Sequence, residues 1–392
     1  MEFSVERAAL LLLICAVVAI LTQRLHLPYS VGLVGAGIVL ALLPFGPEVN
    51  LTKSLLFTFL LPPLIFQAAF SLEWRQLRTD LPVVLLLASV GVALSGAVTA
   101  AGMHFFSHWP WASALVFGAL ISATDPVSVI AAFKGEKVRG RLPDLVESES
   151  LFNDGTAAVA FAICVAAATG SPLTLWQVSG RFVLTIGGSL VSGAVVAYTV
   201  LLLAGRTEDH LVEITFTTVA AYGSFLLAEH LHFSGVLATL VAGLMLGSMR
   251  PMKHITEVGR EAIQSFWDYA AFVANSLVFL LIGIRVAHQH VQGGLSVPLA
   301  IALVLLARAI AVYLCCGVFS RSTLRVSLQH QHVLFWGGLR GALALALALA
   351  LPAEVPGRES VISVSFAVVA FSIFVQGLTM RPMLRRLDDI PD

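Results

Sequence analysis

Charged residues are scarce in this sequence. Asp, Glu, Lys and Arg together make up 12% of its 392 residues, hydrophobic residues make up 58%, and the mean hydropathy is +0.91. Water-soluble domains carry about 25% charged residues. The shortage of charge therefore excludes an ordinary soluble domain and indicates a membrane protein.

Cysteine is scarce as well. The four cysteines all fall within long apolar stretches, with no CxxC pair and no spacing typical of zinc ligands. We therefore expect buried structural thiols. The sequence also lacks linkers and low-complexity tracts, so we expect residues 1–392 to form a single transmembrane domain without a soluble regulatory domain.

Apolar runs, by contrast, fill most of the chain. A helix needs about 17 to 25 mostly apolar residues to cross the core of a bilayer. Thirteen stretches approach this length, which predicts an all-α polytopic membrane protein with about 13 transmembrane helices. The first stretch lacks the basic start and the cleavage site of a signal peptide, so we expect it to be retained. The predicted segments are 7–23, 29–46, 54–71, 82–105, 112–133, 145–168, 181–204, 211–230, 234–249, 263–285, 296–319, 332–351 and 360–380.

The basic residues of the loops favour one orientation, because cytoplasmic loops are enriched in Lys and Arg. If the segments alternate in direction, sixteen basic residues fall in one set of loops and five in the other. We therefore expect the N-terminus outside and the C-terminus in the cytoplasm. The larger set contains Arg24, Arg75, Arg78, Lys134, Lys137, Arg139, Arg141, Arg206, Arg250, Lys253, Arg260, Arg321, Arg325, Arg381, Arg385 and Arg386, and the smaller set contains Arg7, Lys53, Arg181, Arg285 and Arg358.

Two arginines fall inside predicted segments. A charge at membrane depth is costly and needs a partner, so Arg308 and Arg340 each mark a candidate functional position. For Arg308 we expect a structural ion pair with Asp268 of the neighbouring tenth segment. Glu147, close to the basic loop, is expected to be a solvated residue at the membrane interface, with a role in proton entry or pH sensing as the alternative.

The fifth and twelfth segments both contain helix breakers. The fifth includes "ISATDPVSV", in which Pro126 cannot donate a backbone hydrogen bond, and the twelfth includes "FWGGLRGAL", in which three glycines flank Arg340. A broken helix exposes backbone groups with positive partial charge at the N-termini of its halves and negative partial charge at their C-termini. Asp125 and Arg340 have the signs that offset these charges.

The positions of the two breaks predict an inverted repeat. Thirteen segments divide into a first six-helix unit, 7–168, a linking helix, 181–204, and a second six-helix unit, 211–380. A displacement by seven segments turns the second unit upside down in the membrane, and it makes the fifth and twelfth segments counterparts. Interrupted helices at corresponding positions are typical of the binding sites of secondary transporters.

Oxygen-bearing side chains gather beside the first break, in the stretch "ESLFNDG" that begins the apolar part of the sixth segment. Glu149 and Asn153 are one helical turn apart, as are Ser150 and Asp154. Hard oxygen ligands suit cations such as Na⁺. We therefore expect a monovalent cation site that is formed by Asp125, Glu149, Ser150, Asp154 and the backbone carbonyl of Thr124.

A buried carboxylate of this kind binds either a proton or a cation. Competition between the two, in a site that opens alternately to each side, is sufficient for cation/proton exchange. A cation-coupled solute symporter that uses the same carboxylates is the main alternative. An intramembrane aspartyl protease is disfavoured because neither Asp125 nor Asp154 lies in a GxGD motif, and a passive channel would lack the pH dependence of exchange.

Several motifs resemble those of a known family. The stretches "FTFLLPPLIFQAAF", "ATDPVSV", "ESLFNDGTA" and "GGLRGALALALAL" are similar, in this order, to the monovalent cation:proton antiporters, specifically to the NhaP-type bacterial branch related to eukaryotic sodium/proton exchangers. The resemblance implies thirteen helices in two inverted six-helix repeats, a homodimer, and exchange of Na⁺, Li⁺ or K⁺ for H⁺ in the plasma or inner membrane, with a role in pH homeostasis. It implies neither an enzymatic activity, nor a cofactor, nor binding of nucleic acid.

The resemblance also implies roles for individual residues. Asp154 corresponds to the aspartate that binds the cation or the proton, and Asp125, Glu149, Ser150 and the Thr124 carbonyl to further ligands. Arg340 corresponds to an arginine that pairs with Glu149 and braces Asn153. An asparagine before the aspartate, as in Asn153–Asp154, implies electroneutral one-for-one exchange.

Overall fold

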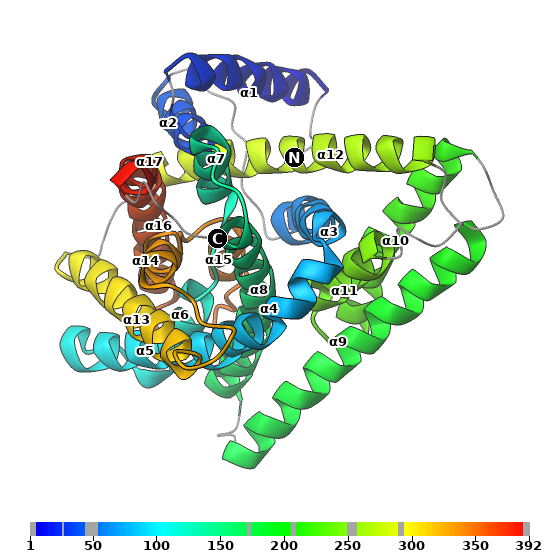
Figure 1. The fold of residues 1–392 in the computed structure, drawn as a ribbon. Coiled ribbons are helices and arrows are strands. Elements are labelled where there is room, and N and C mark those ends of the chain that lie inside the picture. The colour runs from blue at the N-terminus through cyan, green and yellow to red at the C-terminus, as the bar shows by residue number, and fades with distance from the viewer. Residues whose placement is uncertain are drawn as a thin grey trace.

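The computed structural model describes residues 5–25, 27–43, 54–170, 174–204, 209–248, 257–288 and 294–386. Within these ranges the chain forms helices and no strands. Figure 1 shows long helices, among them α9 and α12, around a central group that includes α8, α14 and α15. Lys53, Arg206, Arg250 and Lys253 of the loop-charge argument lie outside the described residues, as do the ends of the predicted segments 29–46 and 234–249.

The helical elements follow one another along the chain. Three short π-helical stretches, η1 to η3, are continuous with α-helices. The elements are α1 (Val5–Leu25), α2 (Tyr29–Leu42), η1 (Leu55–Leu60), α3 (Leu61–Ser71), α4 (Trp74–Leu86), η2 (Leu87–Gly91), α5 (Val92–Ser107), α6 (Trp111–Ile121), α7 (Val127–Glu136), α8 (Arg141–Thr169), α9 (Leu175–Ala204), α10 (His210–His230), α11 (Gly235–Ser248), α12 (Glu257–His288), α13 (Ser296–Val318), α14 (Leu328–Trp336), α15 (Ala342–Leu349), α16 (Arg358–Phe371), η3 (Ser372–Gln376) and α17 (Gly377–Arg386).

The helices coincide with the apolar stretches of the sequence. Each of the thirteen predicted ranges overlaps a helix, a continuous run of helices, or a pair of half-helices. Eight stretches among the described residues are long and apolar enough to cross a membrane, and four further apolar helices are shorter. The chain is therefore an all-helical, multi-pass membrane protein, and the count of thirteen crossings stays a prediction.

Both predicted helix breaks are confirmed. Residues 122–126 separate α6 from α7, and residues 337–341 separate α14 from α15. The two breaks lie against each other, because the backbone N–H of Asp125 donates to the carbonyl oxygen of Leu339 at 2.7 Å. This hydrogen bond thus satisfies one backbone N–H group of the first break and one backbone C=O group of the second.

Arg141 joins three parts of the chain at one end of the helical bundle through one ion pair and two hydrogen bonds. Arg141, at the start of α8, pairs with Asp80 of α4 at 2.6 Å and donates to the carbonyl oxygens of Leu324 and Arg325 between α13 and α14. These connections belong to the set that the loop charges place on one side of the membrane. The shared end agrees with that alternation, and the membrane face that it occupies stays a prediction.

The π-helical turns were not expected from the sequence. Such turns carry one extra residue and leave backbone carbonyls without their usual helical partners. In η2 the carbonyl oxygen of Ala88 accepts a hydrogen bond from the Thr156 hydroxyl on α8. The π-helical turn therefore contributes a direct contact to the helix that carries the candidate site.

Candidate ion-binding site at the crossing of the broken helices

Two aspartates line one cavity next to the crossing of the breaks. Asp125 lies in the first break and Asp154 lies on α8, and both border a cavity of 320 Å³ together with Thr124 and Asn275. Asp125 accepts a hydrogen bond from the backbone N–H of Val127 at 3.0 Å, so its carboxylate lies at the N-terminus of half-helix α7. An acidic group at this end offsets the positive partial charge of the helix, as expected.

One carboxylate oxygen of Asp154 makes no hydrogen bond within the described part of the chain. Its Oδ1 atom is buried and has no hydrogen-bond partner among the described residues. The backbone amide of Thr124 faces the same carboxyl group, and the Thr124 hydroxyl donates to Ser150 Oγ at 3.2 Å. A buried carboxylate oxygen without a partner is costly, and a cation or a proton at this position removes the cost.

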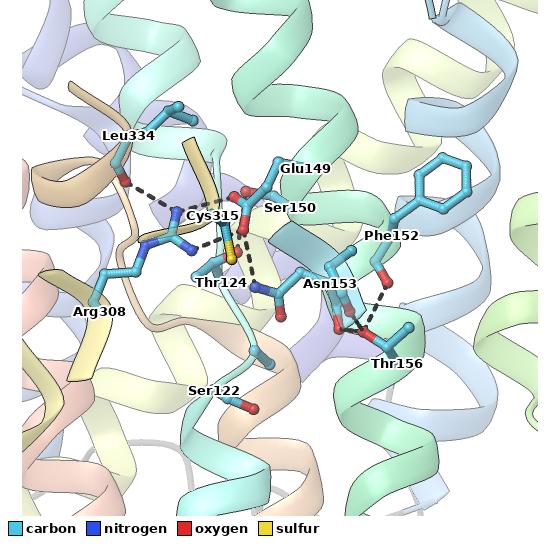
Figure 2. A network of polar contacts seen from close by, with 12 residues as sticks. Ser122, Thr124, Glu149, Ser150, Phe152, Asn153, Thr156, Arg308, Cys315 and Leu334 are labelled. Atoms are coloured by element: carbon cyan, nitrogen blue, oxygen red, sulfur yellow. Dashed lines mark hydrogen bonds and ion pairs between the residues drawn. The ribbon is translucent and has the colours of Figure 1, made fainter. Parts of the chain in front are cut away.

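Glu149 pairs with Arg308, not with Arg340. Arg308 Nη1 donates to Glu149 Oε1 at 2.7 Å, Arg308 Nη2 donates to Oε2 at 3.0 Å, and the Asn153 amide donates to Oε1 at 3.1 Å (Figure 2). The same guanidinium also donates to the carbonyl oxygen of Leu334 at 2.9 Å. The expected Arg340–Glu149 pair is therefore wrong for this structure, because Arg308 of α13 already contacts both oxygens of the carboxylate.

The guanidinium of Arg340 instead donates hydrogen bonds to backbone carbonyl groups. Its Nη1 atom donates to the carbonyl oxygens of Ser122 and Ala123 at 2.6 and 3.1 Å, where half-helix α6 ends. A cation at this position offsets the negative partial charge of the helix C-terminus. This part of the sequence interpretation is confirmed, although the brace between Arg340 and Asn153 is not formed.

The expected pair between Arg308 and Asp268 is also wrong. Asp268 is exposed on α12, where it accepts hydrogen bonds from Gln67 at 2.8 Å and from Gln264 at 3.1 Å. Arg308 is 5% exposed and faces α8. The sequence did mark Arg308 as a charge at membrane depth, but the segment order alone suggested the wrong partner.

The predicted site residues thus separate into two neighbouring groups. Thr124, Asp125 and Asp154 border the cavity. Glu149 and Asn153 are fully buried behind it: Arg308 donates to both Glu149 oxygens and the Asn153 amide nitrogen donates to Glu149, whereas Asn153 Oδ1 has no partner among the described residues. Ser150 is also buried and does not border the cavity, and its hydroxyl accepts a hydrogen bond from Thr124. The first group is suited to bind an ion, and the second group holds the helix that carries Asp154.

Close packing at the second break leads to a stability prediction. A Cβ atom at Gly341 would overlap with the carboxylate of Asp125. We expect Gly341→Ala to lower the free energy of unfolding by about 1–3 kcal/mol, because Asp125 or α15 has to move. Thermal unfolding in detergent measures this change. Gly187→Ala on α9 is the matched control, since nothing lies within 4 Å of its Cβ position, and an equal effect of both substitutions would contradict the prediction.

The fold and the site define a class of protein. Two interrupted helices that cross at a cavity with an unpaired carboxylate oxygen are the arrangement of ion-coupled membrane transporters. Residues 9–386 match the model of the transmembrane sodium/hydrogen exchanger family. The chain belongs to this family, which confirms the resemblance found in the sequence, and it is a transporter, not an enzyme.

Curated relatives agree with this assignment. The chain is 38% identical over 374 residues to the Na⁺/H⁺ antiporter ApNhaP of Aphanothece halophytica, which covers 94% of this chain and 71% of that protein. It is 36% identical over 397 residues to the Na⁺/H⁺ antiporter NhaH of Halobacillus aidingensis, which covers 96% of both chains.

The fold agrees with a solved structure. The sodium proton antiporter MjNhaP1 from Methanocaldococcus jannaschii superposes with a TM-score of 0.77 and 18% sequence identity, and the match covers 98% of both chains. At this identity the comparison supports the shared helical fold alone.

Proposed function

We propose that this protein exchanges Na⁺ for H⁺ across the cell membrane, with Li⁺ and K⁺ as the alternative cations. The observation that carries the proposal is the unpartnered carboxylate oxygen of Asp154, which lies beside Asp125 in a cavity at the crossing of the two breaks. The antiporter names of the relatives favour exchange over cation-coupled solute uptake. The exchanger is proposed to have thirteen crossings in two inverted repeats, to form a homodimer, and to keep its N-terminus outside.

The proposed cycle rests on competition for Asp154. A proton or a cation neutralises the carboxylate, and only the neutralised site crosses the membrane at low cost. The Asp125 carboxylate, the Thr124 carbonyl oxygen and the Ser150 hydroxyl are proposed to complete the cation's oxygen shell. Glu149 is proposed to support the site from behind, because Arg308 engages both of its oxygens.

The first test is transport by purified protein in liposomes with an imposed pH gradient. We expect internal pH to change when Na⁺, or another accepted cation, is added outside. The rate is expected to stay the same when the membrane voltage is clamped at zero, because one charge moves in each direction. A folded protein that responds to no monovalent cation between about pH 5 and 9 would refute the proposal.

The stoichiometry gives a prediction for Asn153. Its side chain donates to Glu149 and does not border the cavity. We expect Asn153→Asp to remain electroneutral, because the new buried carboxylate has no separate counter-charge and takes up a proton. Transport rates at several clamped voltages check this expectation, with wild-type protein as the reference. A rate that follows voltage in the variant alone would assign the stoichiometry to position 153.

A further inference from the structure

The cavity at Asp154 and Asp125 extends to a third carboxylate, which the proposed cycle does not use. Glu147 on α8 and Lys134 on α7 border the same cavity as Asp154 and Asp125. Glu147 is half-buried, and its carboxylate has neither a hydrogen bond nor an ion pair closer than 4 Å within the described part of the chain. The side chain therefore faces open space that leads to the ion site.

Helix geometry places Glu147 on the path to Asp154. The two residues are seven positions apart, which corresponds to about two turns and about 10 Å along one face of α8. The wall between them is largely apolar, with Leu151 of α8, Ile130 of α7 and Leu64 of α3. A low-dielectric wall focuses the field of a charge into the cavity and raises the local concentration of counter-ions.

Charges of both signs act at this end of the cavity. The ammonium group of Lys134 attracts the Glu147 carboxylate, and Asp144, one helical turn earlier on α8, repels it. Lys134 is exposed and forms no ion pair within 4 Å in the described residues. An entering cation is therefore attracted by the carboxylates of Glu147 and Asp144 and repelled by the ammonium group of Lys134.

We propose that Glu147 is an entry station for the transported cation and that Lys134 opposes it. The inference rests on the proposed exchange function. Glu147 attracts the cation before it reaches Asp154, whereas Lys134 lowers the cation's local concentration. Removal of either charge is then expected to change the apparent affinity in opposite directions, while the turnover of the loaded site stays the same.

The test measures initial rates of Na⁺-driven proton movement in everted and right-side-out membrane vesicles. At low ionic strength we expect Glu147→Gln to raise the KM for Na⁺ by about threefold to tenfold with kcat unchanged. Lys134→Gln is expected to lower the KM. Both changes are expected on one membrane face only, which is the cytoplasmic face under the proposed orientation. Glu136→Gln is the matched control, since Glu136 lies at the same end of α7, pairs with Arg385 and does not border the cavity.

Ionic strength distinguishes this role from a structural one. Screening shortens the Debye length from about 30 Å at 0.01 M salt to about 8 Å at 0.15 M, so added choline chloride is expected to reduce the KM difference between wild type and Glu147→Gln. An unchanged KM in Glu147→Gln, a shift of the same sign in both variants, or a shift that salt does not reduce would overturn the inference and leave the exchange function standing. Absence of exchange in wild-type vesicles would overturn the proposed function itself.

Discussion

Asp154→Asn is expected to reduce exchange in proteoliposomes to the level of empty liposomes. The amide has nearly the shape of the carboxylic acid, but it neither releases a proton nor carries the charge that binds a cation. Asp125 borders the same cavity, but its carboxylate is already held by the backbone amide of Val127. The measurement is internal pH after addition of Na⁺, Li⁺ or K⁺ outside, at equal amounts of protein.

Stability separates this loss from misfolding. Asp154 Oδ1 is buried without a partner in the described structure, and a bare buried carboxylate costs free energy. We therefore expect Asp154→Asn to melt at the same temperature as the wild type or higher. Asp144→Asn, the same change on the same helix outside the cavity lining, is the control and should retain exchange at saturating Na⁺. Residual exchange in the Asp154 variant would place the essential titrating group elsewhere.

The local features of this site were predictable from the sequence because their causes are local. Pro126 cannot continue a helix, and the glycines around Arg340 weaken one, so both breaks could be located to within a few residues. The positions of Asp125 and Arg340 at the ends of half-helices were predictable as well, because their charges offset the partial charges of those ends. The glycines have a further role that composition does not reveal. A Cβ at Gly338 would lie 2.5 Å from Arg308 Nε, so this glycine leaves room for the guanidinium.

The partner of Glu149 was not predictable, because it depends on how helices pack. In the sequence, Asp268 and Arg308 lie in consecutive segments, and the family resemblance implied that Arg340 pairs with Glu149. In the structure, α13 packs against η2 and α14, and its arginine reaches Glu149 across 159 sequence positions. Asp268 belongs instead to the contact between α12 and α3. Rows of apolar residues specify that helices pack, but they do not specify the neighbours of each helix.

Arg308→Met is expected to lower the free energy of unfolding by about 3–5 kcal/mol, because it leaves Glu149 buried without its counter-charge. The side chains of the pair are 6% and 1% exposed. Thermal unfolding in detergent gives the measurement. Arg358→Met is the matched control: it breaks a pair of similar length with Glu359, whose side chains are 31% and 76% exposed, and exposed pairs contribute only about 0–1 kcal/mol.

The double variant Arg308→Met with Glu149→Gln tests whether the charge itself is responsible. With both charges removed, no ion is stranded in the interior, so most of the lost stability is expected to return. The Asn153 amide can still donate to the new glutamine oxygen, which keeps α8 in place. If Arg308→Met unfolds at the same temperature as Arg358→Met or higher, then Arg308 does not neutralise the buried charge of Glu149. An equally large loss for Arg340→Met, restored by the same Glu149→Gln change, would return that role to Arg340.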